Sequence, residues 1–173
     1  MSWAIGEGAN EYMTVSQGSF TIIVNSDQDK LLLVKRRDVP VWDLPGGRLE
    51  KGESDLECGI REAKEETGLE IEIIRKIGCY YRPLYQDTQH IFVGRVVGGQ
   101  QILNGPETAS LEWFTLDKLP LFMVPNRKAQ ILDYIRKKEP GDVVINDSKI
   151  FYFFRQLIKK IKKRKDSIVK EEL

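Results

Sequence analysis

The sequence has little of the residues that mark disulfide-rich or metal-thiolate proteins. Its 173 residues include two cysteines, Cys58 and Cys79, and a single histidine, His90. Two cysteines are too few for a disulfide framework and have no metal-ligand spacing, so we expect reduced thiols. Aromatic and basic residues do not interleave as they do in recognised nucleic-acid modules, which argues against a dedicated nucleic-acid-binding domain.

Long hydrophobic runs are missing as well. No apolar stretch approaches the ~20 residues that a membrane-spanning helix needs, and the first twelve residues are polar and acidic, unlike a signal peptide. We therefore expect a cytoplasmic protein. The content of 41% hydrophobic and 31% charged residues is ordinary for a globular protein, and the length suits one domain with a substantial core.

The most informative stretch is 47–69. Ser54 and Glu57 have the S-x-x-E spacing of a capping box, which predicts a helix that begins near Asp55. Gly68 supplies the left-handed residue that commonly ends a helix. Residues at helical spacing between these signals should form a narrow buried stripe: Leu56, Ile60, Ala63 and Thr67.

Three carboxylates crowd one side of this expected helix. Glu62, Glu65 and Glu66 have i, i+3 and i+4 spacing, and like charges ~4 Å apart repel by about 1 kcal/mol in bulk water and about 4 kcal/mol near a protein surface. Only Arg61, one turn before Glu65, is placed to offset this repulsion. A solvated outer face is one interpretation. The preceding 45–47 turn, whose glycines let the backbone approach a ligand closely, favours a site for Mg²⁺ or Mn²⁺.

Gly47, Glu53 and the run 61–69 follow the spacing G-x5-E-x7-R-E-U-x-E-E-x-G-U, where U is bulky and apolar. The stretch resembles the Nudix box, and Ala63, which is small for the first U position, is its one soft match. Weaker features similar to MutT-like Nudix hydrolases extend from about residue 18 to 138. The resemblance implies an α/β Nudix fold, a mixed β-sheet sandwiched between helices as an α/β/α sandwich.

The resemblance also implies hydrolysis of a nucleoside diphosphate linked to another group, with Mg²⁺ or Mn²⁺ as cofactor. Either Glu62 or a loop glutamate would accept the proton of the attacking water, and Arg61 and Glu53 would hold the ligating carboxylates. Glu107 lies six residues before Trp113, a spacing similar to that of a metal-binding loop glutamate in MutT-like enzymes; Glu112 is its competitor. The expected catalytic residues are Glu53, Arg61, Glu62, Glu65 and Glu107, and the expected metal ligands are Glu62, Glu65, Glu66, Glu107 and a carbonyl of Gly46 or Gly47.

Four residues are candidates for substrate binding, each with a plainer alternative. Arg36 and Arg37 end an expected strand and either meet a phosphate or base or form a solvated edge. Asn126 is either an ordinary helix N-cap or, by resemblance to MutT-like enzymes, a contact to the base. Tyr85 either packs in the core or, as in relatives that act on dinucleoside polyphosphates, contacts substrate. His90 is expected to be a wall or structural residue rather than a catalytic base.

Nucleoside triphosphates, oxidised or not, are the favoured substrates. ADP-ribose, dinucleoside polyphosphates and sugar nucleotides also suit the box. A protein of a different class, a Nudix module that senses a nucleotide without cleaving it, typically lacks box glutamates. All of them are present here, which favours an enzyme.

Strand-like runs occupy 19–24, 30–35, 70–77, 79–84, 90–97 and 111–114, with a hairpin between the first two. A helix is expected over 127–138, with Ala129, Ile131, Leu132 and Ile135 on its inner side. We expect a Nudix domain over 1–140 and a helical extension over 141–173.

The extension should contain a basic amphipathic helix that begins at Asp147 or Ser148. Residues 148–173 hold nine basic and three acidic side chains. Packing of its apolar face on its own domain or on a partner subunit, as in a homodimer, is the favoured interpretation. Contact with a membrane surface or RNA is the lesser alternative.

Overall fold

The structure is a computed structural model that describes residues 15–103 and 105–146. Its strands are β1 (Ser16–Val24), β2 (Lys30–Arg36), β3 (Trp42–Asp43), β4 (Gly46–Arg48), β5 (Leu69–Arg82), β6 (Asp87–Gly99), β7 (Thr108–Thr115) and β8 (Gly141–Val144). The helices are α1 (Asp55–Thr67) and α2 (Pro125–Ile135), with a 3-10 turn η1 (Pro83–Tyr85) between β5 and β6. Within these ranges no helix has the length and apolarity to cross a membrane.

The strands form one mixed sheet in the order β3-β2-β1-β6-β5-β8, with β4 paired to β1 and β7 paired to β2. β1 runs parallel to β6, and β5 runs parallel to β8. The remaining pairs are antiparallel, including the β1–β2 hairpin. The predicted mixed sheet and the predicted hairpin are both confirmed.

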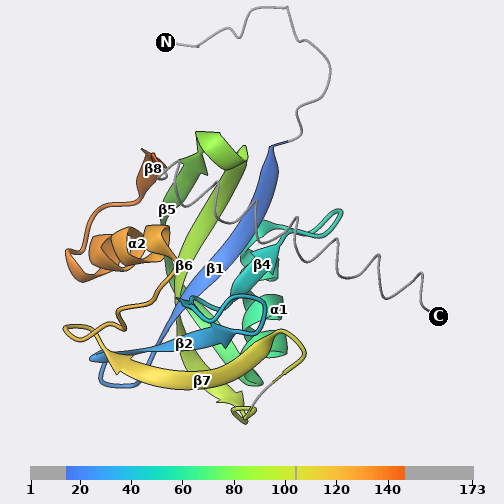
Figure 1. Cartoon of the computed structure of the whole chain (residues 1–173), viewed down its shortest axis with the longest axis vertical. Helices are drawn as coiled ribbons and strands as arrows, with labels where there is room; N and C mark the ends of the chain where they lie inside the picture. The colour runs from blue at the N-terminus through green and yellow to red at the C-terminus, as the bar shows by residue number, and fades with distance from the viewer. Residues whose placement is uncertain (1–14, 104, 147–173) are drawn as a thin grey trace, which may run out of the picture.

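Each face of the sheet carries its own hydrophobic core. Because neighbouring strand residues point to opposite faces, Ile22 packs with Ile131 of α2, whereas Ile23 packs with Ala63 of α1. The two helices therefore cover opposite faces (Figure 1). The predicted α/β/α sandwich is confirmed.

Helix α1 has the predicted ends. The Glu57 N–H donates to Ser54 Oγ at 3.2 Å, and the Ser54 N–H donates to Glu57 Oε2 at 2.9 Å, which completes the capping box. Gly68 ends the helix with a φ of 76°. The buried stripe differs from the prediction, because Leu56 is 43% exposed. The contact with the sheet is centred on Gly59, where an added Cβ would lie 2.9 Å from Ser19 Oγ.

The chain 69–82 is one strand, not the two that we predicted. Gly78 does not end β5; instead the register with β6 shifts between Lys76 and Gly78. A Cβ at Gly78 would lie 2.5 Å from the Gly141 carbonyl oxygen. This glycine therefore allows β8 to approach β5.

Helix α2 begins and ends earlier than predicted, and the predicted inner face is confirmed only in part, at Ile131. Val124 is its N-cap and Pro125 follows at the first position, so the N-cap interpretation of Asn126 was wrong. Ala129 and Ile135, which we expected to be buried, are exposed. The buried positions are Asn126, Arg127, Gln130 and Ile131, so the start of the inner face is polar.

The expected extension begins as part of the sheet. Gly141–Val144 form β8, and the Ile145 N–H donates to the Tyr81 carbonyl at 2.8 Å. The predicted domain boundary after Pro140 stays a prediction. The predicted basic helix lies outside the described residues.

Candidate active site

A cavity of about 880 Å³ gathers seven of the predicted site residues: Arg36, Gly47, Glu62, Glu65, Glu66, Tyr85 and Glu107. They come from β2, β4, α1, η1 and the loop before β7, elements that meet beside β1 and the start of α2. Arg37, Glu53, Arg61 and Asn126 do not line this cavity. The side chains of these four residues instead form hydrogen bonds with neighbouring protein groups.

Two consecutive glycines bring the backbone of β4 against the glutamates of α1. A Cβ on Gly47 would lie 2.2 Å from Glu62 Oε1, so any other residue here would displace this carboxylate. The Gly46 N–H donates to Glu66 Oε2 at 2.9 Å. The turn thus fixes two carboxylates that point into the same cavity.

Arg61 joins three glutamates. Its Nε donates to Glu53 Oε1 at 2.7 Å, and its Nη1 donates to Glu62 Oε1 at 2.9 Å and to Glu65 Oε2 at 3.1 Å. Hydrogen bonds from Arg61 and from the Glu50 N–H lower the pKa of Glu53 to about 2. Arg61 therefore contacts Glu62 and Glu65 without lining the cavity, and Glu53 in turn holds Arg61.

Carboxyl groups crowd one another in the cavity. Burial, followed by repulsion from Glu62 and Asp43, raises the pKa of Glu66 to about 8. Burial, with repulsion from Glu65 and Glu107, also raises the pKa of Glu62. Carboxylate oxygens are the hard ligands that divalent cations such as Mg²⁺ prefer.

The carboxylates are not yet gathered as ligands. In the part of the chain that the structure describes, no three Asp, Glu, His or Cys side chains are grouped so that they could hold a metal ion. The Glu65 side chain is 59% exposed, and its present partner is Arg61, whose Nη1 lies 3.1 Å from Glu65 Oε2. Cation binding would thus require at least one carboxylate to exchange its present contact.

The two arginines at the end of β2 differ in their positions. Arg36 lines the cavity, where it makes two 2.8 Å hydrogen bonds to Asp38. Arg37 instead donates from Nε to the Gly105 carbonyl at 2.8 Å, and its N–H donates to the Glu107 carbonyl at 3.0 Å. Arg37 therefore holds the loop that presents Glu107. The competitor of Glu107, Glu112, is exposed on β7 and does not line the cavity.

Sequence reasoning missed a buried polar network beside the cavity. Arg127 is 2% exposed; its Nε donates to Asp43 Oδ1 at 2.5 Å, its Nη1 donates to Gln89 Oε1 at 2.8 Å, and its guanidinium lies 3.5 Å from the centre of the Phe20 ring. Asn126 Nδ2 donates to the same Gln89 oxygen at 2.7 Å, and Asn126 Oδ1 is buried without a hydrogen-bond partner. The available signal was the run of polar residues on one face of α2.

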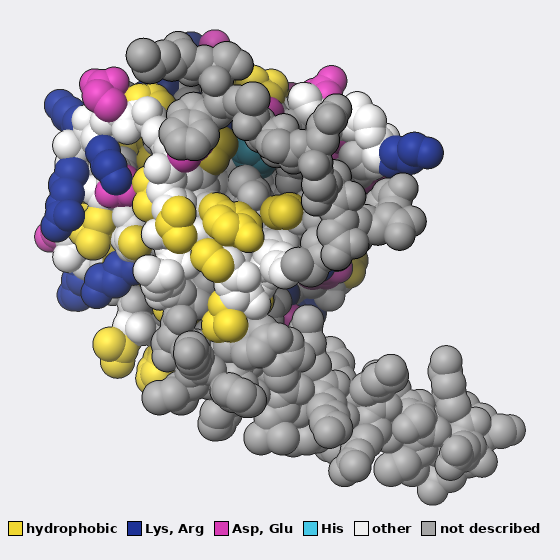
Figure 2. All heavy atoms as spheres, turned by 90° about the horizontal axis from the view of Figure 1, so that it is seen from above, with side chains coloured by type: hydrophobic (Ala, Val, Ile, Leu, Met, Phe, Trp, Pro, Cys, Tyr) yellow, Lys and Arg dark blue, Asp and Glu magenta, His cyan; other side chains and the backbone are white. Residues whose placement is uncertain are grey.

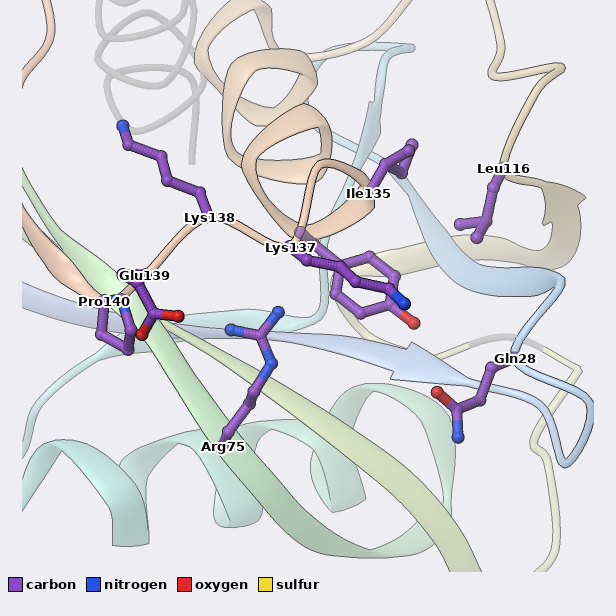
Figure 3. A pocket seen from close by; sticks show the side chains of 9 residues that line it. Gln28, Arg75, Leu116, Ile135, Lys137, Lys138, Glu139 and Pro140 are labelled. Atoms are coloured by element: carbon purple, nitrogen blue, oxygen red, sulfur yellow. The ribbon is translucent and has the colours of Figure 1, made fainter.

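A second cavity, of about 600 Å³, lies at the other end of α2 and holds no predicted site residue. Arg75, Tyr134, Lys137 and Lys138 are among its lining residues. Figure 2 shows Lys and Arg side chains gathered along one edge of the molecule. The side chains of Lys137 and Lys138 point in different directions (Figure 3). The cations therefore do not converge on one ligand position.

The fold and the carboxylate-lined cavity define a hydrolase of phosphoric anhydrides. A sequence profile of the NUDIX domain matches residues 15–135, and the chain belongs to the Nudix hydrolase family. Members of this family generally use divalent metal ions.

Relatives of the protein carry names that indicate different substrates. The chain is 51% identical over 133 residues to a Bacillus subtilis (strain 168) protein with the provisional name 8-oxo-dGTP diphosphatase, covering 77% of this chain and 89% of that protein. It is 36% identical over 123 residues to the ADP-ribose pyrophosphatase of Methanocaldococcus jannaschii, and the match covers 67% of this chain and 71% of that protein. Among solved structures, an ADP-ribose pyrophosphatase from Streptococcus suis 89-1591 is 26% identical with a TM-score of 0.61, covering 76% of this chain and all of that one.

Proposed function

We propose that this Nudix hydrolase uses Mg²⁺ or Mn²⁺ to hydrolyse nucleoside triphosphates, including those with an oxidised purine. The products are a nucleoside monophosphate and inorganic diphosphate. The observation that carries the proposal is the placement of Glu62, Glu65, Glu66 and Glu107 around one cavity. The similarity to the Bacillus subtilis protein, whose name specifies 8-oxo-dGTP, supports the substrate class.

Each side chain has a defined task in this reaction. The carboxylates of Glu62, Glu65, Glu66 and Glu107, with the Gly47 carbonyl, would hold the metal ions, which when bound lower the pKa of a coordinated water and offset the charge of the diphosphate. Glu62 or Glu107 accepts the proton of the attacking water. Arg36 lies on the cavity wall, where its guanidinium is available to a phosphate in exchange for Asp38.

Asn126 is our candidate for recognition of the base. Its Oδ1 atom is buried without a partner, an arrangement that costs about 1–3 kcal/mol unless a donor satisfies it. Its neighbours Val124 and Arg127 line the cavity. An N–H group of a purine base that enters beside them would supply the missing donor.

A single screen tests the reaction and the substrate. Purified protein with Mg²⁺ or Mn²⁺ is incubated with 8-oxo-dGTP, dGTP, ADP-ribose and a dinucleoside polyphosphate, and products are separated by ion-exchange chromatography. We expect monophosphate and diphosphate from the triphosphates, with 8-oxo-dGTP preferred. Preferential cleavage of ADP-ribose would refute the proposed substrate. Binding without any cleavage would indicate a nucleotide-sensing module.

Glu65→Gln tests the carboxylate site with a matched control. It removes one charged ligand, and we expect kcat to fall at least about a hundredfold. Glu70→Gln removes a glutamate of the same charge from an exposed ion pair with Lys64 and should leave kcat unchanged. Equal activity of the two variants would remove Glu65 from the mechanism.

Asn126→Ala and Gln130→Ala separate base recognition from structure. Both side chains hydrogen-bond to Gln89 in the buried network, but only Asn126 has an atom without a partner. We expect Asn126→Ala to raise KM for the preferred triphosphate about tenfold with little change in kcat. If Gln130→Ala raises KM equally, Asn126 contributes only to the packing of the network.

Three further expectations accompany this proposal. The cytoplasmic location is supported by the unpaired thiols of Cys58 and Cys79. A homodimer and a surface contact through residues 148–173 remain predictions. Sedimentation of the full chain alone gives its oligomeric state and tests the homodimer. Co-sedimentation with anionic liposomes or RNA, compared with that of a chain that ends at residue 146, tests the surface contact. Identical co-sedimentation of the two chains would refute the surface contact.

A further inference from the structure

A second cluster of reactive side chains lies outside the active site. Cys79 Sγ is 3.3 Å from His90 Nδ1, on the neighbouring strands β5 and β6. Lys76 Nζ lies 3.1 Å from the same nitrogen and 2.5 Å from Asp55 Oδ2, at the start of α1. Asp55 Oδ2 is in turn 3.2 Å from His90 Nδ1. None of these residues lines the cavity that holds the glutamates.

The contacts of His90 fit one tautomer of its neutral ring. Its Nε2 lies 3.1 Å from Gln17 Oε1, an oxygen that only accepts hydrogen bonds, so Nε2 carries the proton. Its Nδ1 faces one acceptor, Asp55 Oδ2, and two donors, the Lys76 ammonium and the Cys79 thiol. In a neutral ring with the proton on Nε2, Nδ1 has the lone pair toward which both donors point. Burial and repulsion from Lys76 lower the pKa of His90, which keeps the ring neutral at pH 7. The imidazole therefore presents a base to the Cys79 thiol.

Lys76 remains positively charged beside the thiol. Although burial acts against it, hydrogen bonding to Asp55 and attraction to Cys79 and Asp55 raise the pKa of Lys76. The ammonium also contacts both Asp55 Oδ2 and His90 Nδ1, the two atoms that a metal ion would need as ligands here. The cluster is therefore suited to proton transfer rather than to metal binding.

We propose that Cys79 is a reactive thiol and a site of covalent modification by soft electrophiles, among them hydrogen peroxide. The thiol proton passes to His90 Nδ1, and the thiolate that remains is stabilised by the Lys76 ammonium, as in other cysteines activated by a neighbouring base and cation. Asp55 accepts a hydrogen bond from the Nδ1–H that this transfer creates.

The reaction with peroxide balances without a further reactant. The thiolate attacks one peroxide oxygen, the S–O bond forms as the O–O bond breaks, and the released hydroxide takes the proton from His90 to become water. Sulfur is oxidised by two electrons to the sulfenic acid and peroxide is reduced. Two carboxylates oppose thiolate formation: Asp55, and Asp142, which is paired with Cys79 across β5 and β8. Lys76 and protonated His90 offset their charge.

Cys58 provides an internal control in the same chain. It is a fully buried residue of α1, and burial with repulsion from Glu53 raises the pKa of its thiol to about 12. It should therefore react slowly with the same reagents at pH 7. Peptide mapping by mass spectrometry distinguishes the two cysteines without a substitution.

The test is the rate of carboxamidomethylation of the full chain by iodoacetamide, followed at pH 7 and pH 10. We expect Cys79 to react at least about tenfold faster than Cys58 and faster than the thiol of glutathione at pH 7. Lys76→Met should slow Cys79 about tenfold at pH 7, whereas Lys76→Arg, which keeps the cation, should not. At pH 10, where an ordinary thiol is ionised, the Lys76→Met deficit should disappear.

His90→Asn and peroxide complete the test. His90→Asn should slow alkylation of Cys79 at pH 7, and dilute hydrogen peroxide should produce a dimedone adduct on Cys79 that is absent in Cys79→Ser. Alkylation of Cys79 no faster than that of Cys58, or a Lys76→Met deficit that is equal at both pH values, would overturn the proposal. The second result would show that Lys76 affects only access to the thiol.

Discussion

At the scale of single residues, Gly47 matters to the active site because its missing side chain leaves room for the Glu62 carboxylate. An added methyl group would lie 2.2 Å from Glu62 Oε1 and displace this carboxylate. We predict that Gly47→Ala lowers kcat about a hundredfold, because misplacement of a reacting group by about 1 Å can cost this much. Gly141→Ala, whose Cβ would have no atom within 4 Å, is the control and should retain activity in the same assay.

The raised pKa of Glu66 predicts how the metal-free protein responds to pH. Since the carboxyl has a pKa of about 8 in the folded state and an ordinary pKa of 4.5 in the unfolded chain, the folded state holds its proton more tightly than the unfolded state. This effect costs no stability below pH 4.5 and reaches its full cost above pH 8. Chelated protein should therefore lose stability as the pH rises through this window.

Thermal unfolding of Glu66→Gln checks that prediction. The amide cannot ionise, so the difference in Tm between the variant and the wild type, both in chelator, should grow in favour of the variant from pH 4.5 to pH 8. Excess Mg²⁺ should stabilise the wild type more than the variant, because the ion binds a charged ligand only in the former. A pH-independent difference in Tm would contradict the assigned ionisation.

At the scale of elements, the accuracy of prediction from sequence depended on how local the signals were. The ends of α1 were predicted correctly because the capping box and Gly68 lie within the helix or next to it. The role of Gly78 was missed because it depends on Gly141, a residue 63 positions later in the chain. The Arg127–Asp43 ion pair joins residues 84 positions apart, and no local pattern specifies such a contact.

The same distinction applies to the candidate site. The box spacing predicted glutamates that do line one cavity, because a single helix turn and an adjacent glycine turn place them together. The sequence could not distinguish Arg36 in the cavity from Arg37 behind the loop, since alternate strand residues exchange faces with any shift in register. A bulge between Lys35 and Arg36 produces such a shift.

Gly78 gives the prediction at this scale. Gly78→Ala places a Cβ 2.5 Å from the Gly141 carbonyl, so β8 must move away from β5. We expect the free energy of unfolding to fall by about 1–3 kcal/mol, as for other overpacked positions, with KM little changed because β8 does not line the active-site cavity. Urea unfolding measures the first quantity. An unchanged midpoint would show that the β5–β8 pairing contributes little stability.

At the scale of the whole molecule, β8 bears on where the domain ends. Gly141–Val144 extend the sheet beside β5, and Val143 and Ile145 pack against the core cluster that includes Ile131 of α2. A boundary after residue 146 would keep these contacts, whereas the boundary that we predicted after residue 140 would remove them and expose the edge of β5.

Two truncated chains decide between the boundaries. A chain of residues 1–146 should keep its cooperative unfolding and its hydrolysis of triphosphates, since it retains every described element. A chain of residues 1–140 should unfold at a lower Tm and aggregate at high concentration, because it loses a strand and buried apolar contacts. Differential scanning calorimetry and light scattering measure both effects. Equal stability of the two chains would support the boundary at residue 140 and would make β8 a dispensable addition to the sheet.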